Sequence, residues 1–518
     1  MKAPDPEASE QPQPEESTPE SAGIRRRARL GVVLLGARAV LQQLTILVAN
    51  VYLARTLTPA DYGIFAIVQF AMSLFTLFGD AGLGTALIQK HERPERRELS
   101  TIFWFQLGIA IAILTVVYAS APFVLLLWDD LPDGSVWLLR GLALGFLFTM
   151  LRAVPMLLLE RSLRYGWIAT LEFLGTMAFY GTAVVMASRG AGATSLVSAS
   201  VAQAAALAVA ANLVQPFVPA LAFDRERLGK LVRFGVAFQG KHAIGFVNHA
   251  VVPLFAGARL GKTVLGHIQF AQQIGYFPSL PVGIISRVTF PLLSRLQRDR
   301  PAFVAEVERA VLFCGVPTFW FAGLVCGLGP SIVSVIYSDK WMPAVPALYV
   351  YALTFAAGFY FTILGSAVDA FGRPQLMLRL TAFATVVNWA CVAVVTSVGR
   401  SPLVFALGYA VHVAVGNVAL LVAFKGLLPE ARPLARLWAP ALSAVVVGGL
   451  ARAALPWSAS PLRLTACVLG SAIVFAGMVL ALDRSLWAAL KAGIGRDKAA
   501  EAPPEHASAN SDDPAVEL

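Results

Sequence analysis

The chain has 518 residues, of which 57% are hydrophobic and only 14% are charged. An average soluble domain carries about 25% charged residues, so the composition excludes a string of water-soluble domains. The formal net charge is +10, but the basic residues are spread over short loops without a binding motif, which argues against nucleic acid as a partner. Apolar runs of about 20 residues recur and do not alternate with period two, so we predict an all-helical integral membrane protein.

In chain order, the sequence begins with a polar tail and continues through fourteen apolar spans. Residues 1–23 are rich in Pro, Glu, Ser and Gln, and we expect them to be disordered, as we do residues 491–518. Transmembrane helices are predicted at about 30–53, 62–88, 101–127, 136–159, 167–188, 195–219, 232–257, 264–290, 308–337, 344–370, 378–398, 402–424, 436–455 and 463–483.

The distribution of Arg and Lys sets the predicted orientation. If the N-terminus is cytoplasmic, basic clusters such as Arg25–Arg29 and Lys90–Arg97 fall in cytoplasmic segments, and the loops on the opposite side carry few basic residues. Cytoplasmic loops of membrane proteins carry the excess of Lys and Arg. We therefore expect both termini to lie in the cytoplasm.

An internal repeat divides the chain. Gly36-Ala37-Arg38, Ala54-Arg55 and Asp61-Tyr62-Gly63 align with Gly240-Lys241-His242, Ala258-Arg259 and Val264-Leu265-Gly266. Both copies start on the same side, which predicts two lobes related by an axis along the membrane normal. We expect an N-terminal lobe of six spans (24–220), a C-terminal lobe of six (221–425) and two extra helices (426–490).

Two basic residues fall near the middle of predicted spans. Arg38 and Lys241 each lie about nine residues into the first and seventh span, or roughly 14 Å deep at 1.5 Å per residue. Ionisable groups at this depth usually face a bundle interior or a water-filled cavity. We predict a cationic cavity between the lobes that receives an anionic group, with Arg152 and Arg287 as further members. The alternative is structural charges tied to helix carbonyls or to acidic partners.

Polar side chains recur at helical spacing on four of the predicted spans. Such stripes indicate either a wet face on a membrane helix or hydrogen bonds between helices. The candidates for contact with a ligand are Gln42, His242, Asn248 and Gln272. Asp80, Glu172 and Asp369 are candidates for coupling transport to an ion, or for balancing the cavity's arginines. His242 and His249 are seven residues apart without carboxylate or Cys companions, so no metal site is predicted.

Motifs for enzymatic chemistry are absent from the sequence, so we expect neither an enzyme nor a cofactor. Residues 257–263 (GARLGKT) resemble a phosphate-binding loop, but Ala256 replaces its first glycine and no strand precedes it. The longest internal polar segment, around 295–309, is too short for a catalytic domain. Two GxxxG spacings, Gly141 to Gly145 and Gly323 to Gly327, predict close helix packing.

Several segments together resemble one family of transporters. These are residues 50–63 (NVYLARTLTPADYG), 78–84 (FGDAGLG), 86–89 (ALIQ), 99–104 (LSTIFW), 159–164 (LERSLR), 340–346 (KWMPAVP) and 372–374 (GRP). They are similar to Wzx-type polysaccharide transporters, flippases of the multidrug/oligosaccharidyl-lipid/polysaccharide (MOP) superfamily. The resemblance covers about residues 28–425, while the last two predicted spans carry no recognised motif.

This resemblance implies a V-shaped pair of lobes with alternating access. The implied substrate is a polyprenyl-diphosphate-linked oligosaccharide carried across the bacterial inner membrane for lipopolysaccharide or exopolysaccharide biosynthesis. The implied partners are a polysaccharide polymerase, glycosyltransferases and membrane lipid. The protein is expected to be a monomer. The family's cationic lumen corresponds to Arg38 and Lys241, with Arg152 and Arg287 as further members.

Three other functions stay open at this point. A drug/cation antiporter of the same superfamily should place carboxylates where this chain has Arg38 and Lys241. A flippase for the peptidoglycan lipid precursor would share the cationic cavity. A scaffold or lipid scramblase predicts no effect of charge at Arg38.

Overall fold

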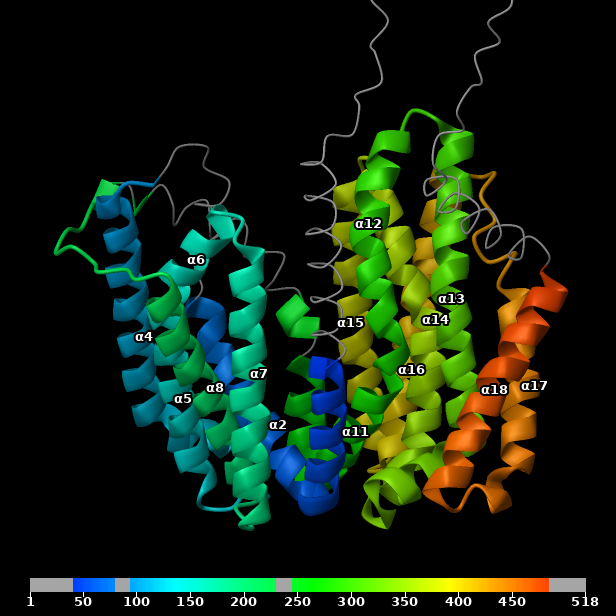
Figure 1. The fold of residues 1–518 in the computed structure, drawn as a ribbon, viewed down its shortest axis with the longest axis horizontal. Helices are drawn as coiled ribbons and strands as arrows, with labels where there is room; N and C mark the ends of the chain where they lie inside the picture. The colour runs from blue at the N-terminus through cyan, green and yellow to red at the C-terminus, as the bar shows by residue number, and fades with distance from the viewer. Residues whose placement is uncertain (1–40, 80–93, 227, 230–244, 249, 484–518) are drawn as a thin grey trace, which may run out of the picture.

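A computed structural model describes residues 41–79, 94–226, 228, 229, 245–248 and 250–483. Within these residues every regular element is a helix, which confirms the predicted all-helical class. Figure 1 shows the helices in two groups that stand side by side, with α2 and α11 between them at the lower end.

The N-terminal group runs from residue 41 to α8. It contains a first helix, Leu41–Thr56, followed by α2 (Pro59–Gly79), α4 (Arg96–Leu125), α5 (Ser135–Leu151), α6 (Ala153–Arg161), α7 (Tyr165–Ser188) and α8 (Ala193–Val214).

The C-terminal group runs from residue 245 to α18. After helical residues 245–248 and 250–251 it contains the π-helix η1 (Val252–Ala256), α10 (Gly257–Leu260), α11 (Lys262–Gly275), the 3₁₀ turn η2 (Phe277–Ser279), α12 (Leu280–Leu296), α13 (Arg300–Ser331), the π-helix η3 (Ile332–Tyr337), the 3₁₀ helix η4 (Asp339–Ala344), α14 (Val345–Ala370), α15 (Pro374–Val398), α16 (Pro402–Leu427), α17 (Trp438–Ala453), η5 (Leu455–Trp457) and α18 (Pro461–Leu482).

The chain is a multi-pass membrane protein, although the predicted number of fourteen spans is not confirmed. Nine helices of the described residues are long and apolar enough to cross a membrane, or ten if the sharply bent pair Leu41–Thr56 and Pro59–Phe75 counts as one. The predicted span 264–290 is broken at η2, between α11 and α12. Proline at 278 and 281 explains this break, because proline lacks the N–H that continues a helix. Helix α17 has only 16 residues.

The start of α2 shows how one of the family-like segments folds. The backbone N–H of Asp61 donates to Thr58 Oγ1 at 3.3 Å, and Thr58 N–H donates to Asp61 Oδ2 at 2.8 Å. This reciprocal pair is a capping box, and Pro59 occupies the first helical position, where its missing N–H costs nothing. Asp61 Oδ1 also accepts the N–H of Ala193 at the start of α8, 3.0 Å away. The segment thus fixes where α2 begins and which helix it contacts.

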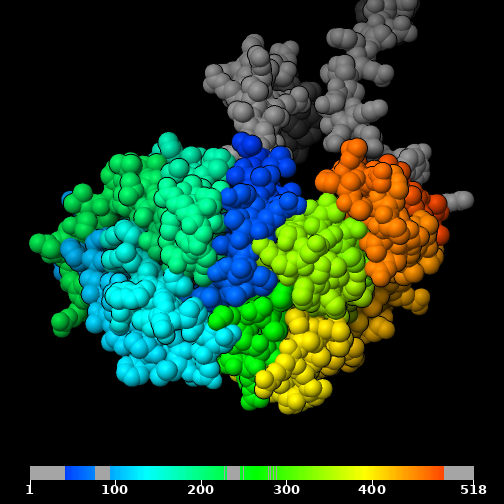
Figure 2. Space-filling model, turned by 90° about the horizontal axis from the view of Figure 1, so that it is seen from below, coloured from blue at the N-terminus to red at the C-terminus, as the bar shows by residue number. Residues whose placement is uncertain are grey.

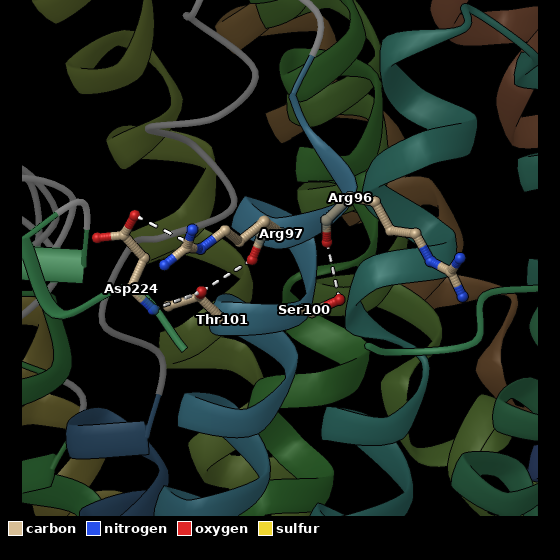
Figure 3. A network of polar contacts seen from close by, with 5 residues as sticks. All are labelled: Arg96, Arg97, Ser100, Thr101 and Asp224. Atoms are coloured by element: carbon tan, nitrogen blue, oxygen red, sulfur yellow. Dashed lines mark hydrogen bonds and ion pairs between the residues drawn. The ribbon is translucent and has the colours of Figure 1, made fainter. Parts of the chain in front are cut away.

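The connection between the two groups is fixed to the start of α4. Ser100 Oγ accepts the N–H of Ala220, and Thr101 Oγ1 accepts that of Asp224, at 2.9 and 3.0 Å. Arg97 lies 3.9 Å from the Asp224 carboxylate. Figure 3 shows Arg97, Thr101 and Asp224 as one network at the top of α4. The segment that connects the two groups therefore lies beside the first turn of α4, at the end of the N-terminal group opposite to the start of α2.

The first of the two extra helices after α16, α17, packs on α13 through glycines. A Cβ on Gly323 would lie 2.5 Å from the Ala444 carbonyl oxygen of α17, and one on Gly327 would lie 2.4 Å from Ala451 Cβ. These distances are shorter than side chains allow, so the second GxxxG spacing permits the close packing predicted from the sequence. At Gly141 and Gly145 the nearest atoms, from valines of α8, would be at ordinary contact distances of 3.5 and 3.6 Å.

Candidate functional site

The two helix groups touch through a reciprocal pair of glycines in α2 and α11. A Cβ on Gly63 would lie 1.8 Å from the carbonyl oxygen of Lys262, and a Cβ on Gly266 would lie 1.8 Å from that of Pro59. In the internal repeat, Gly63 aligns with Gly266 and Pro59 with Lys262. Each helix therefore places its glycine against the first turn of its counterpart, which is the contact that a two-fold repeat produces.

Each group also sends a hairpin with a buried tryptophan onto the other. Trp128, between α4 and α5, donates from Nε1 to the Pro253 carbonyl at 3.1 Å. Trp341, between α13 and α14, donates to the Ala54 carbonyl at 2.8 Å. The Trp341 ring stacks on Phe270 with centroids 4.2 Å apart and meets Tyr62 edge-on at 5.2 Å. The hairpin after the third span of each repeat thus binds a backbone carbonyl of the other group through its tryptophan.

Charged side chains complete the contact. Lys262 Nζ lies 3.1 Å from Asp130 Oδ1 and donates to the Asp130 carbonyl at 2.5 Å. Arg55 donates from Nε to the Ile336 carbonyl at 2.7 Å and from a terminal nitrogen to the Val335 carbonyl. These carbonyls lie at the end of η3, where a helix leaves acceptors unpaired. Lys340 Nζ donates to the Arg55 carbonyl at 2.6 Å.

We call this set of residues the clasp. Figure 2 looks onto it and shows the blue N-terminal residues in the middle of the face, bordered by green and yellow-green segments of the C-terminal group. The clasp includes part of residues 257–263, the segment whose sequence resembles a phosphate-binding loop. Gly257 packs so close to Trp128 that a Cβ on it would lie 2.7 Å from Trp128 Nε1. The clasp consists of Ala54, Arg55, Pro59, Gly63, Trp128, Asp130, Pro253, Gly257, Lys262, Gly266, Val335, Ile336, Lys340 and Trp341.

The model of one protein family, described as "polysaccharide biosynthesis protein", matches residues 52–346 of this sequence. This match covers more than half of the chain. The chain belongs to this family.

Three curated relatives carry compatible names. The chain is 22% identical over 370 residues to the lipopolysaccharide biosynthesis protein WzxC of Escherichia coli, covering 70% of this chain and 72% of WzxC. It is 23% identical to the teichuronic acid biosynthesis protein TuaB of Bacillus subtilis, over 57% of this chain and 62% of TuaB. It is 26% identical to the succinoglycan biosynthesis transport protein ExoT of Rhizobium meliloti, over 58% of this chain and 61% of ExoT. The matched region thus spans about three fifths of TuaB and ExoT.

Solved structures share the fold. The lipid II flippase MurJ, in an inward closed conformation, superposes with a TM-score of 0.73 over 88% of this chain and 99% of MurJ, at 14% identity. An inward-facing multidrug transporter of the MATE family, within the MOP superfamily, gives a TM-score of 0.57 over 76% of this chain and 96% of that protein, at 15% identity. At these low identities the likeness shows a shared fold, which confirms the predicted fold class.

The predicted site residues that the structure describes in the N-terminal group lie on the first helix, at the junction of α5 and α6, and on α7. Gln42 of the first helix donates to Thr176 Oγ1 of α7 at 3.0 Å. Arg152 is half-buried at the junction of α5 and α6, and its Nε is buried without a hydrogen-bond partner. Glu172 of α7, an exposed residue, is the acidic side chain that interacts electrostatically with Arg152. The structure thus brings Arg152 and Glu172 together.

Asn248 and Gln272 are held by neighbouring helices of the C-terminal group. Asn388 of α15 donates to Asn248 Oδ1 at 3.1 Å, and Gln272 of α11 donates to the Tyr351 hydroxyl of α14 at 3.2 Å. Asp369 lies in the last turn of α14, at an end of the helix rather than at its middle. Arg287 lies within α12. Arg38, Asp80, Lys241 and His242 lie outside the described residues.

Sequence reasoning missed most of the clasp as a functional unit. It quoted Gly63, Gly266 and Trp341 as parts of the repeat or of the family resemblance, but it gave no role to Trp128, Asp130 or Lys262. The repeat contained a usable signal, because equivalent glycines near the start of equivalent helices are the residues expected at a two-fold contact.

Proposed function

We propose that this protein is a flippase that moves polyprenyl-diphosphate-linked oligosaccharide repeat units across the bacterial inner membrane, for lipopolysaccharide or exopolysaccharide biosynthesis. The family and the names of the relatives support this class of cargo. They also support a transporter rather than an enzyme. The observation that carries the proposal is the clasp, since it joins two similar helix groups at one end and leaves their separation at that end dependent on a small set of contacts.

The proposed mechanism is alternating access between two six-helix lobes, residues 24–220 and 221–425. With both termini in the cytoplasm, as the Arg and Lys distribution predicts, the clasp lies at the periplasmic face. The described state is then closed to the periplasm. Release of cargo requires Gly63 and Gly266 to part from the opposite helix, together with withdrawal of both tryptophan hairpins. Helices that rock about a fixed central site are the usual solution for such transporters.

The proposed site for the diphosphate is the set of basic residues inside the membrane. Arg152 lies nine residues from the end of the span Ser135–Arg161, about 14 Å deep at 1.5 Å per residue. Its Nε–H has no acceptor, and leaving a buried charged donor unpaired is costly. A phosphate oxygen would satisfy this donor in the geometry that guanidinium favours. Arg38 and Lys241, predicted at a similar depth, would supply two further charges.

The test is surface-glycan export in cells that lack other flippases. We expect Arg152→Gln, Arg38→Ala and Lys241→Ala each to lower export about ten- to a hundredfold, the loss that follows when a charged hydrogen bond is removed. Lipid-linked oligosaccharide should accumulate while the protein stays in the membrane. Arg140→Gln is the matched control, because Arg140 is held by the Tyr118 carbonyl at 2.9 Å and by the Trp137 ring.

Export at the wild-type level in all three variants would contradict the cationic site. Depletion of the protein separates the other functions. Accumulation of the peptidoglycan lipid precursor would favour that flippase activity, and drug sensitivity with normal lipid pools would favour the antiporter.

A further inference from the structure

A cavity of about 310 Å³ lies inside the C-terminal group. It is lined by Asn248, by the junction of α11 and α12 and by α14, α15 and α16. The lining residues include Thr354 of α14 and His412 and Asn417 of α16. Thr354 lies nine residues after the start of the 26-residue helix α14, so the cavity lies near mid-membrane. Its volume is at the lower end of the roughly 300–1,000 Å³ typical of small-molecule sites. The proposed diphosphate site does not use it.

Two residues that line this cavity each have a buried polar atom without a hydrogen-bond partner. Asn417 donates from Nδ2 to the Ala357 carbonyl at 2.9 Å, but its Oδ1 accepts nothing. His412 interacts with the Tyr409 carbonyl of its own helix, yet Nδ1 makes no hydrogen bond of normal geometry. The two side chains are 3% and 7% exposed. Buried polar atoms of this kind are normally satisfied, so these two indicate a polar occupant.

Threonine hydroxyls extend the set of acceptors. Thr354, Thr381 and Thr385 donate their hydroxyl protons to carbonyls of the preceding turn, at 2.6, 2.9 and 2.9 Å. Each oxygen keeps lone pairs that can accept a further hydrogen bond. The wall therefore offers several hydroxyl and amide groups that can accept, and it suits an occupant that brings its own O–H groups.

Aromatic rings form another part of the wall. Tyr276 meets Phe355 edge-on with centroids 5.4 Å apart, and Phe355 lies 6.0 Å from Tyr409. Tyr276 is 51% exposed at the junction of α11 and α12, where Gly283 is exposed as well. These two residues mark the open side of the cavity. Apolar ring faces beside hydroxyl acceptors suit a molecule that has both C–H faces and O–H groups.

The described lining residues carry no carboxylate and, besides His412, no basic side chain. A metal cation is a poor fit, because ions such as Ca²⁺ require six to eight oxygen ligands within about 2.6 Å, and this volume equals that of about ten water molecules. A phosphate is a poor fit because, among the described lining residues, only His412 could carry a positive charge. A neutral sugar ring meets each requirement of volume, acceptors and aromatic faces.

We infer that this cavity is a saccharide subsite, which takes a neutral sugar residue of the lipid-linked oligosaccharide. The inference rests on the proposed function. The subsite is in the C-terminal group, whereas Arg152 lies in the N-terminal group, so the sugar would be held by one half and the diphosphate at least partly by the other. Recognition of the sugar then selects glycan-bearing lipid over the bare carrier lipid.

The test uses the purified full-length protein in lipid nanodiscs and two probes: a polyprenyl diphosphate that bears one neutral hexose, and the same lipid without sugar. We expect the wild type to bind the sugar-bearing lipid about tenfold more tightly or better, as two or three added hydrogen bonds would give. Gly283→Leu should reduce this ratio to about one. A Cβ at Gly283 meets no atom within 4 Å, so leucine can enter the mouth of the cavity without moving α12.

Two further variants keep the experiment decisive. Gly470→Leu in α18 is the control, because a Cβ there is also free of contacts within 4 Å and Gly470 does not line the cavity. It should keep the wild-type ratio. Thr385→Val removes one acceptor at nearly constant shape and should lower the ratio only in part.

Three outcomes would overturn the inference. If the wild type binds neither lipid, the proposed function itself fails. If it binds both but Gly283→Leu keeps the full preference, the function stands and the cavity holds only water. If Gly283→Leu keeps the preference but abolishes an effect of sodium on lipid binding, the cavity is a cation site.

Discussion

The clasp has two halves that correspond by position and differ in chemistry. The C-terminal hairpin places the fully buried Trp341 against the rings of Phe270 and Tyr62, whereas the N-terminal hairpin gives Trp128 one edge contact with Phe70 at 6.3 Å. The N-terminal hairpin adds an ion pair between Asp130 and Lys262, and 60% of the Asp130 side chain is exposed.

Because of this difference, the two halves of the clasp should be stabilised mainly by packing in one case and partly by electrostatics in the other. The half that contains Trp341 should supply most of the free energy that holds the two groups together, since buried aromatic contacts outweigh exposed ion pairs. The half that contains Asp130 should respond to salt. The glycine contact between α2 and α11 is common to both halves, because it sets how closely the helices approach.

The glycine contact should give the largest effect. A Cβ at Gly63 or Gly266 would lie 1.8 Å from a backbone oxygen, which cannot move aside as a flexible side chain could. Gly63→Leu and Gly266→Leu should each shift the protein from the closed to the open state by roughly five- to 150-fold or more, given about 1–3 kcal/mol for overpacking. The measurement is double electron–electron resonance between two spin labels, with the native cysteines replaced. The labels are at Gly134 and Arg259, which are exposed and belong to different helix groups.

The control for this prediction is Gly181→Leu in α7, where a Cβ meets nothing within 4 Å. It should leave the distance distribution unchanged. If Gly63→Leu also leaves it unchanged, the clasp is not the contact that closes this end.

The glycines show what the sequence could and could not predict. The repeat aligned Gly63 with Gly266, and hydrophobicity predicted an all-helical membrane protein, because both signals are local. The carbonyl that each tryptophan reaches depends on how a hairpin folds over the other group, and no periodicity encodes it. The break at η2 was missed because proline is tolerated inside membrane helices, so Pro278 and Pro281 do not by themselves predict where a helix ends. His412 and Asn417 escaped notice because single polar residues on an apolar helix look like ordinary interhelical contacts.

The two tryptophans should give an intermediate and unequal effect. Trp341→Ala leaves the buried Ala54 carbonyl without its donor, so the closed state should lose about 1–2 kcal/mol relative to the open state. The stacking of Trp341 on Phe270 lies within the C-terminal group, so its loss affects both states. Trp128→Ala also removes a hydrogen bond, to Pro253, but fewer ring contacts, and its effect should be smaller. The same pair of spin labels measures both. Equal shifts, or a larger shift for Trp128→Ala, would contradict the proposed division between the two halves.

The ion pair should give the smallest effect, and a distinct one. Exposed pairs contribute about 0.2–1 kcal/mol, so Asp130→Asn should change the closed population less than about fivefold. The interaction is screened by salt, with a Debye length of about 10 Å at 0.1 M. The wild-type closed population should therefore fall between 0.05 and 0.5 M salt, by roughly the amount that Asp130→Asn loses. Asp133→Asn, in the same hairpin, is the matched control and should keep the salt response. Lys262 also donates to the backbone carbonyl of residue 130, and Asp130→Asn preserves this contact. Any salt response that survives in Asp130→Asn would therefore have to come from other charges. The electrostatic role would then belong to Arg55 and Lys340 instead.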